Sequence, residues 1–190
     1  MTRSAHLAAA VLTTLALGAP LRTARAESIV MQPGAHPIYR VELEPHFSFQ
    51  PLEPPRVEVG AGPGFGPGVR VAIELLDNGP IPTINNTMAL GLGLDWIHFT
   101  RGGRCIDAAC EDTKVDHFYF PVALQWNFWL TDRWSVFGEP GIAYRFSPQT
   151  EDGIDNFIVG VGARFHFAPR VTLTLRAGYP STSAGLSFLL

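Results

Sequence analysis

Two side chains in the stretch "PHFSF" have the types and the spacing that could perform catalysis. His46 and Ser48 stand two residues apart, so in a β-strand they would lie on one face, a general base beside a nucleophile. Glu139 offers a carboxylate that could orient the histidine. Such a trio could hydrolyse an ester. Because His-x-Ser is a common coincidence, we treat the esterase as an alternative and expect no enzyme activity and no catalytic residue.

Cysteine and histidine spacing predicts a disulfide and no metal site. Cys105 and Cys110 lie close together in "RGGRCIDAACEDTK", and in an exported protein such a pair is expected to form a local disulfide. His98, His117 and His166 are scattered and have no ligand spacing. We therefore expect no bound metal and no cofactor.

The elements that would position these residues follow a period of two. From 118 to 130 every even position is apolar, and the polar side chains fall on odd positions. This pattern indicates a strand, because successive side chains point to opposite faces. "TDR" at 131–133 is a short turn, and the alternation resumes over 134–146. The segment is therefore predicted to be a hairpin with one apolar face.

The same alternation recurs along the chain and predicts eight strands. They cover 39–49, 69–75, 88–96, 118–130, 134–146, 157–167, 171–177 and 184–190. Long and short links alternate, apart from a short "YPST" between the last two strands, as in an outer-membrane barrel with long outside loops and tight periplasmic turns. The predicted fold class is all-β, an eight-stranded antiparallel up-and-down transmembrane β-barrel over 39–190.

Charged side chains of both signs fall on the face opposite the apolar one. That face is also rich in glycine, which suits the crowded interior of a narrow barrel better than a solvated exterior. Enclosed charges must pair, and a nearly balanced set can do so. We therefore predict an interior charge network that holds the barrel closed, made of Arg40, Glu42, Glu44, Arg70, Glu74, Asp95, Glu139, Arg145, Arg164 and Arg176.

Aromatic side chains gather toward the strand ends. Phe120 and Phe128 are eight residues apart, which corresponds to about 20 Å across a membrane for a tilted barrel strand. The predicted aromatic girdle contains Trp96, Phe118, Phe120, Phe128, Trp129, Trp134, Tyr144, Phe157, Phe165 and Phe167. Alternation by itself also fits a soluble lipocalin-like periplasmic binding barrel with its apolar face inward, which stays as an alternative.

The first 26 residues are typical of a secretory signal peptide. They have a basic start at Arg3, an apolar core too short to span a bilayer, and the cleavage motif "ARA" at 24–26. Residues 27–38 would be a short periplasmic N-terminal tail. Cleavage removes three arginines and no acid, so the formal net charge changes from −3 to −6. We therefore expect no nucleic acid partner.

On this architecture, and on hairpins such as "FPVALQWNFWLTDRWSVFGEPGIAYRF", residues 39–190 resemble small outer-membrane β-barrels of the OmpA-transmembrane-domain and OmpX type. The resemblance implies a Gram-negative outer-membrane location, a monomer surrounded by outer-membrane lipid and lipopolysaccharide, and insertion by the barrel assembly machinery. The terminal aromatic of that family is present in weakened form in "GLSFLL", where Phe188 precedes a terminal Leu190.

Eight strands leave an interior that side chains just fill, so no wide pore is expected. We expect a non-enzymatic barrel with a structural role in the envelope or a surface-binding role through its outer loops. Some outer-membrane lipid A deacylases use a serine, a histidine and a carboxylate, so a lipid A deacylase-like esterase using His46 and Ser48 remains the enzymatic alternative. Strand parity places both residues inside the barrel, away from a lipid substrate.

Overall fold

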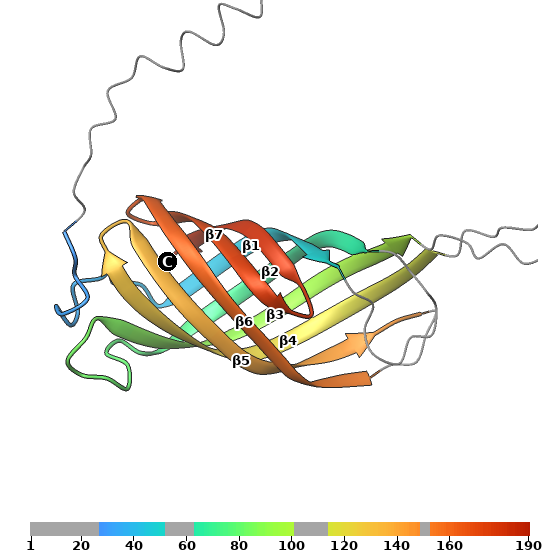
Figure 1. Cartoon of the computed structure of the whole chain (residues 1–190), viewed down its shortest axis with the longest axis horizontal. Coiled ribbons are helices and arrows are strands. Elements are labelled where there is room, and N and C mark those ends of the chain that lie inside the picture. The colour runs from blue at the N-terminus through green and yellow to red at the C-terminus, as the bar shows by residue number, and fades with distance from the viewer. Residues whose placement is uncertain (1–26, 52–62, 101–113, 149–152) are drawn as a thin grey trace, which may run out of the picture.

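The strands close into one barrel. The computed structural model describes residues 27–51, 63–100, 114–148 and 153–190. In order along the chain the strands are β1 (Val41–Gln50), β2 (Gly64–Leu76), β3 (Asn86–Thr100), β4 (Lys114–Thr131), β5 (Trp134–Phe146), β6 (Gly153–Ala168), β7 (Val171–Tyr179) and β8 (Thr182–Leu189). Each strand pairs antiparallel with the next, and β8 pairs with β1 (Figure 1). The predicted eight-stranded antiparallel barrel is confirmed.

Strand β2 begins five residues earlier than the alternation predicted. Gly64 pairs with Gln50 and Gly68 pairs with His46, in a stretch whose glycines and proline resemble a loop in sequence. The glycines are needed because β3 passes close by: a Cβ built on Gly66 would collide with the backbone carbonyl of Trp96. In this part of β2 the backbone of the neighbouring strand occupies the space that side chains would otherwise fill.

The barrel is apolar outside and polar inside. Val161, Ile142 and Leu175 are 62%, 51% and 51% exposed, whereas Glu42, Asn127 and Thr174 are 1% exposed or less. A soluble barrel needs the reverse arrangement, because apolar side chains left in water cost free energy. This distribution contradicts the lipocalin-like alternative. Among the described residues, no helix is long and apolar enough to cross a membrane.

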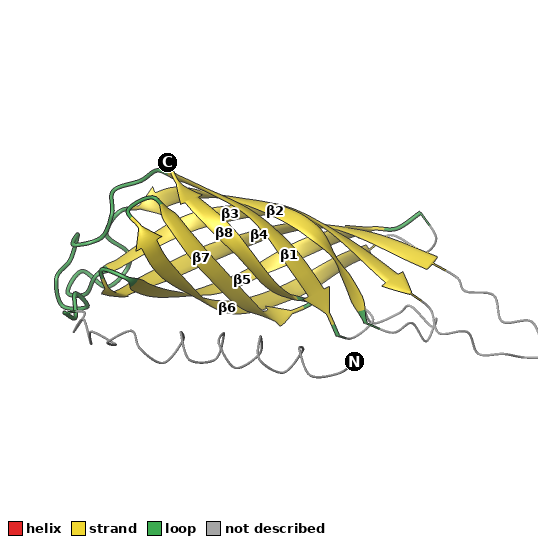
Figure 2. Ribbon diagram, turned by 90° about the horizontal axis from the view of Figure 1, so that it is seen from above, coloured by secondary structure: helices red, strands yellow, loops and turns green. Residues whose placement is uncertain are grey.

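The two ends of the barrel differ. The β2–β3, β4–β5 and β6–β7 turns lie at one end, which we call the short-turn end, together with the C-terminus and the N-terminal segment that begins at residue 27 (Figures 1 and 2). In the sequence-based orientation this end faces the periplasm. At the opposite end, which we call the long-link end, β1, β3 and β5 lead into the links 51–63, 101–113 and 147–152, and the β7–β8 turn there is short.

Candidate functional site

Arg176 on β7 is the centre of the barrel's interior. Its Nε donates to Glu139 Oε2 at 2.7 Å, and its Nη1 donates to Glu44 Oε1 at 2.7 Å. Nη2 donates to the second oxygen of each carboxylate, at 3.1 Å for Glu44 and 3.2 Å for Glu139. All three side chains are buried. One guanidinium therefore ties β1, β5 and β7 together across the bore, with charge-assisted bonds that fix its geometry.

Arg70 on β2 extends this network toward β3. Its Nη1 donates to Glu139 Oε2 at 3.2 Å, and its Nη2 lies 3.7 Å from Asp95 Oδ2. The other oxygen of Asp95 accepts from Ser48 Oγ at 3.0 Å and contacts His46 Nε2 at 2.5 Å. His46 Nδ1 faces the backbone carbonyl of Glu44 at 3.2 Å. His46 is therefore held between the Asp95 carboxylate on β3 and the backbone of its own strand.

A second ion pair lies nearer the short-turn end. Arg164 Nε and Nη2 donate to the two oxygens of Glu42 at 3.0 and 2.9 Å, and Nη1 donates to Asn127 Oδ1 at 2.8 Å. With its amide oriented to satisfy both neighbours, Gln125 donates to Glu139 Oε1 at 2.9 Å and accepts from Arg164 Nη2 at 2.5 Å. Gln125 thus joins the two halves of the network.

The aromatic ring of Phe137 on β5 packs against both arginines. The guanidinium carbon of Arg164 lies 4.2 Å from the centroid of Phe137, and that of Arg176 lies 5.0 Å away. These are cation–π distances. Gly162 provides the room for the ring, because a Cβ at that position would overlap its edge.

The network leaves little open space in the bore. The interior cavity between Glu42, Arg70 and Arg176 has a volume of about 10 Å³, and the one bordered by Asp95, Arg70 and Tyr179 has about 30 Å³. Such volumes hold only one or two water molecules. Toward the long-link end the interior is filled by an apolar cluster made of Ile97, Phe99, Val115, Tyr119, Ala123, Ala143 and Ile158. Side chains of the described residues therefore fill the bore around the network and toward the long-link end.

The catalytic trio considered from the sequence does not assemble. Ser48 donates to Asp95 and not to His46, and Glu139 binds Arg176 and Arg70. The hydroxyl of a nucleophilic serine must hydrogen-bond to the base that will take its proton, whereas here it donates to a carboxylate oxygen that the histidine also contacts. Ser48 is also completely buried. This geometry does not support the lipid A deacylase-like alternative.

Two charged residues expected in the network, Arg40 and Glu74, lie at the short-turn end, and a third, Arg145, is an interior residue near the other end. Arg40 precedes β1 and is exposed, and its backbone N–H donates to the carbonyl of Leu190 at 2.8 Å. The alternation predicted a strand from residue 39, in which Arg40 would face the interior. Because β1 begins only at Val41, Arg40 lies outside the strand and its side chain is not directed inward. Glu74 is half-buried at the short-turn end. Arg145 is buried on β5 opposite Tyr119, toward the long-link end.

Nine of the ten aromatics assigned to the girdle point outward. Trp96 stacks on Phe118 with ring centroids 6.4 Å apart, and Phe120 meets Tyr144 at 6.4 Å, forming a cross-strand row on β3, β4 and β5. At the other end Trp134 meets Phe165 at 5.0 Å. The remaining outward members are Phe128, Phe157 and Phe167.

Trp129 differs from the girdle prediction and points into the barrel. It is 1% exposed, as its odd position in the alternation requires, and it lies 4.9 Å from the ring of His166 and 5.4 Å from that of His36. With Ile29, Tyr39 and Leu189 it forms a small apolar cluster at the short-turn end. Its nearness to the turn suggested the rim, but parity decides the face.

The N-terminal tail covers this end of the barrel. Ile29 N–H donates to the carbonyl of Leu130 at 3.0 Å, and Asn85 N–H donates to the carbonyl of Val30 at 2.7 Å. The tail then turns at Gly34, whose φ of 78° favours glycine, and brings His36 over Trp129. Residues 27–38, which we predicted as a tail, therefore include a segment anchored to the barrel.

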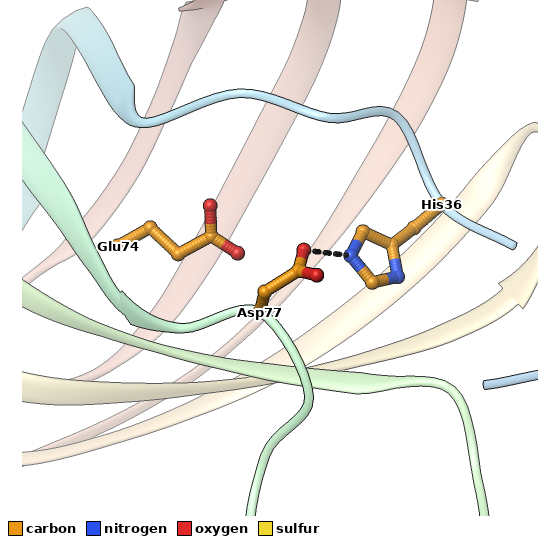
Figure 3. A group of neighbouring side chains, drawn as sticks. All are labelled: His36, Glu74 and Asp77. Carbon is orange, nitrogen blue, oxygen red and sulfur yellow. Dashed lines mark hydrogen bonds and ion pairs between the residues drawn. The ribbon is translucent and has the colours of Figure 1, made fainter. Parts of the chain in front are cut away.

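A cluster of possible metal ligands results from this anchoring. His36, Glu74 and Asp77 each present a ligand atom, and these atoms lie within 4.8 Å of one another (Figure 3). Sequence reasoning did not identify this cluster, because it expected Glu74 in the interior network and did not expect His36 to dock. The cysteines of the predicted disulfide, Cys105 and Cys110, and the predicted signal peptide over 1–26 lie outside the described residues.

No protein-family model matches the chain, and no curated protein matches it. Among solved structures, it is similar to the outer membrane protein OprG from Pseudomonas aeruginosa, at 8% identity and a TM-score of 0.49, covering 84% of this chain and 99% of that one. The crystal structure of Ail, the attachment invasion locus protein of Yersinia pestis, is similar at 12% identity and a TM-score of 0.46, covering 79% and 99%. The assignment of the barrel fold to this chain rests on its own strand pairing.

Proposed function

We propose that this chain is an outer-membrane β-barrel protein with a closed interior, which acts as a structural or surface-binding component of the envelope and not as a wide pore or an enzyme. One observation carries the proposal. The outward faces of all eight strands present apolar side chains, while the inward faces hold a paired charge network. A barrel of this polarity is stable only where hydrocarbon surrounds it.

A charge placed on the outer face tests the membrane assignment. Leu175 lies mid-strand on β7 and is 51% exposed. If it faces hydrocarbon, Leu175→Arg should cost about 2–4 kcal/mol and reduce insertion into lipid vesicles. Asp132→Arg, in the exposed β4–β5 turn, is the matched control and should insert as the unmodified chain does. The proposal would be contradicted if the unmodified chain were a water-soluble monomer. It would also be contradicted if the Leu175→Arg variant were more soluble in water than the unmodified chain.

The closed interior is tested by permeability. Closure of the inserted barrel is first checked by heat modifiability, that is, by a change in its gel migration when it is heated in detergent. Vesicles that contain this protein should swell in small sugars no faster than empty vesicles, whereas a general porin should produce rapid swelling. The cavities beside Arg70 and Arg176, of about 10 and 30 Å³, are far smaller than a sugar. Swelling comparable to that of the porin would show that the network does not block the bore.

Outer-membrane lipid and lipopolysaccharide are the expected surroundings of the apolar wall, the barrel assembly machinery would insert it, and the protein would be a monomer. A surface-binding role would use the links at 52–62 and 101–113, which lie outside the described residues. Deleting each link and measuring cell adhesion separates the two roles, because a purely structural barrel should lose only stability.

A further inference from the structure

The cluster formed by His36, Glu74 and Asp77 has no part in the proposed function. Its three side chains come from separate places: the N-terminal tail, the end of β2, and the residue just after β2 (Figure 3). His36 Nε2 lies 3.2 Å from Asp77 Oδ1, a spacing close to that between two ligands of one metal ion. The three ligand atoms already lie within 4.8 Å of one another.

A β-bulge brings the two carboxylates to the same side. Residues 74 and 77 are three apart, so a regular strand would point their side chains to opposite faces. The pairing of β2 with β3 passes from Glu74 opposite Ala89 to Leu76 opposite Met88, which leaves Leu75 as an extra residue. The bulge changes the parity beyond it, and Asp77 then turns toward the tail and Glu74.

The histidine is held in place before any ligand binds. His36 Nδ1 lies 2.6 Å from Asn85 Oδ1, and its ring stacks on Trp129 with an interplanar angle of 19°. With Asn85 in this orientation, Nδ1 carries the hydrogen and Nε2 faces the carboxylates. A metal-binding histidine is oriented in the same way, by a hydrogen bond from its other nitrogen.

The cluster also has the charge that attracts a cation. Two carboxylates approach each other beside one imidazole, and the neighbouring Arg40 is exposed, so solvent screens its charge. The side chain of Asp77 is 74% exposed, while that of His36 is 1% exposed. The cluster is thus rigid on the barrel side and open to water on the other side.

We infer that His36, Glu74 and Asp77 bind one divalent transition-metal ion of the Zn²⁺ type, with water completing the coordination. One imidazole nitrogen and two carboxylate oxygens are ligands that Zn²⁺ accepts, whereas an imidazole is a poor ligand for Ca²⁺ or Mg²⁺. The ion links the N-terminal tail to β2, so its role is to fasten the cover of the short-turn end.

The experiment is a titration of the folded barrel in detergent micelles, whose closure is checked first by heat modifiability. This separates the test from the membrane proposal. Co²⁺ gives a visible absorption when nitrogen and oxygen ligands surround it, and Zn²⁺ is then added in competition. We expect saturation at one Co²⁺ per chain and complete displacement by Zn²⁺.

The variants distinguish a built site from scattered surface carboxylates. Glu74→Gln and Asp77→Asn keep the shape of the side chains, and each should weaken Zn²⁺ binding by more than about 100-fold, because loss of an outer-shell partner alone costs about 10–100-fold. Asn85→Ala removes such a partner and should fall within that smaller range. Asp132→Asn, an exposed acid at the same end, should leave binding unchanged.

Two results would overturn the inference. One is the absence of saturable Co²⁺ or Zn²⁺ binding to a heat-modifiable barrel, which would leave His36 and Asp77 as a simple ion pair. The other is unchanged affinity in both Glu74→Gln and Asp77→Asn, which would place any bound ion elsewhere.

Discussion

Replacing Arg176 with methionine should destabilise the barrel more than any change at an exposed arginine. Methionine keeps much of the length of the side chain but removes the donors to Glu44 and Glu139. The two carboxylates lose different amounts. Glu139 keeps Arg70 at 3.2 Å, whereas Glu44 keeps Ser187 at 3.5 Å and His46 at 3.7 Å. Glu44 is therefore the group left with an uncompensated buried charge.

The expected magnitude follows from that loss. Removing one partner of a buried ion pair costs about 3–5 kcal/mol, because the remaining charge stays desolvated. If the orphaned Glu44 is the cause, adding Glu44→Gln to Arg176→Met should restore part of the stability, with a coupling energy of about 1–3 kcal/mol between the two sites. The cost then belongs to the unpaired charge and not to lost packing.

Urea unfolding of the vesicle-inserted barrel, followed by tryptophan fluorescence, measures these differences. Arg170→Met, in the exposed β6–β7 turn, is the matched control and should lie within about 0.5 kcal/mol of the unmodified chain. An Arg176→Met barrel as stable as this control would refute the reasoning. So would a double variant that shows no coupling, because the charge of Glu44 would then not be the source of the cost.

Three further predictions concern packing and protonation. Gly162→Ala should cost about 1–3 kcal/mol in the same urea assay, since the new methyl overlaps the Phe137 ring, whereas Gly138→Ala, with open space at its Cβ, should cost far less. Trp129→Ala should cost about 3–5 kcal/mol, and the outward Trp134→Ala clearly less; equal losses would contradict the inward placement of Trp129. Burial raises the pKa of the Tyr39 phenol above its ordinary value of 10.0, so the folded chain keeps a proton that the unfolded chain releases. Stability should therefore fall as the pH rises above 10, and less steeply in Tyr39→Phe, as unfolding midpoints between pH 8 and 11 would show.

The alternation of side chains was sufficient to predict most of the fold, because a barrel wall has two chemically opposite faces. A shift of one residue would turn every outward apolar side chain inward, so each strand's face is strongly specified. This explains why the faces of β4 and β5 follow the sequence pattern throughout. The pattern failed where other forces act: glycines let β2 continue from Gly64 to Gly68, and β1 starts only at Val41, which leaves Arg40 outside.

The alternation predicts which face of the sheet a side chain occupies but not which other side chain it pairs with, and this limits what the sequence could predict about the interior. Arg176 binds Glu44, 132 residues away in the chain, because the stagger of the strands around the closed barrel brings β7 level with β1. Nothing in the local pattern distinguishes Glu44 from Glu42, which binds Arg164 instead. The same stagger gives His46 the carboxylate of Asp95 and not that of Glu139, and so separates the residues of the hypothesised catalytic trio.

The cluster at the short-turn end depends on two events that a period of two cannot record. One is a single extra residue at Leu75, and the other is the return of the tail across the barrel to place His36 beside Trp129. A bulge is a break in the period, so it weakens the strand signal at the position where it creates a new arrangement of side chains. The docked tail has no period, because two backbone hydrogen bonds to the barrel and one stacked ring hold it. In a narrow barrel filled by its own side chains, such breaks at the ends are where groups that bind ligands can still meet water.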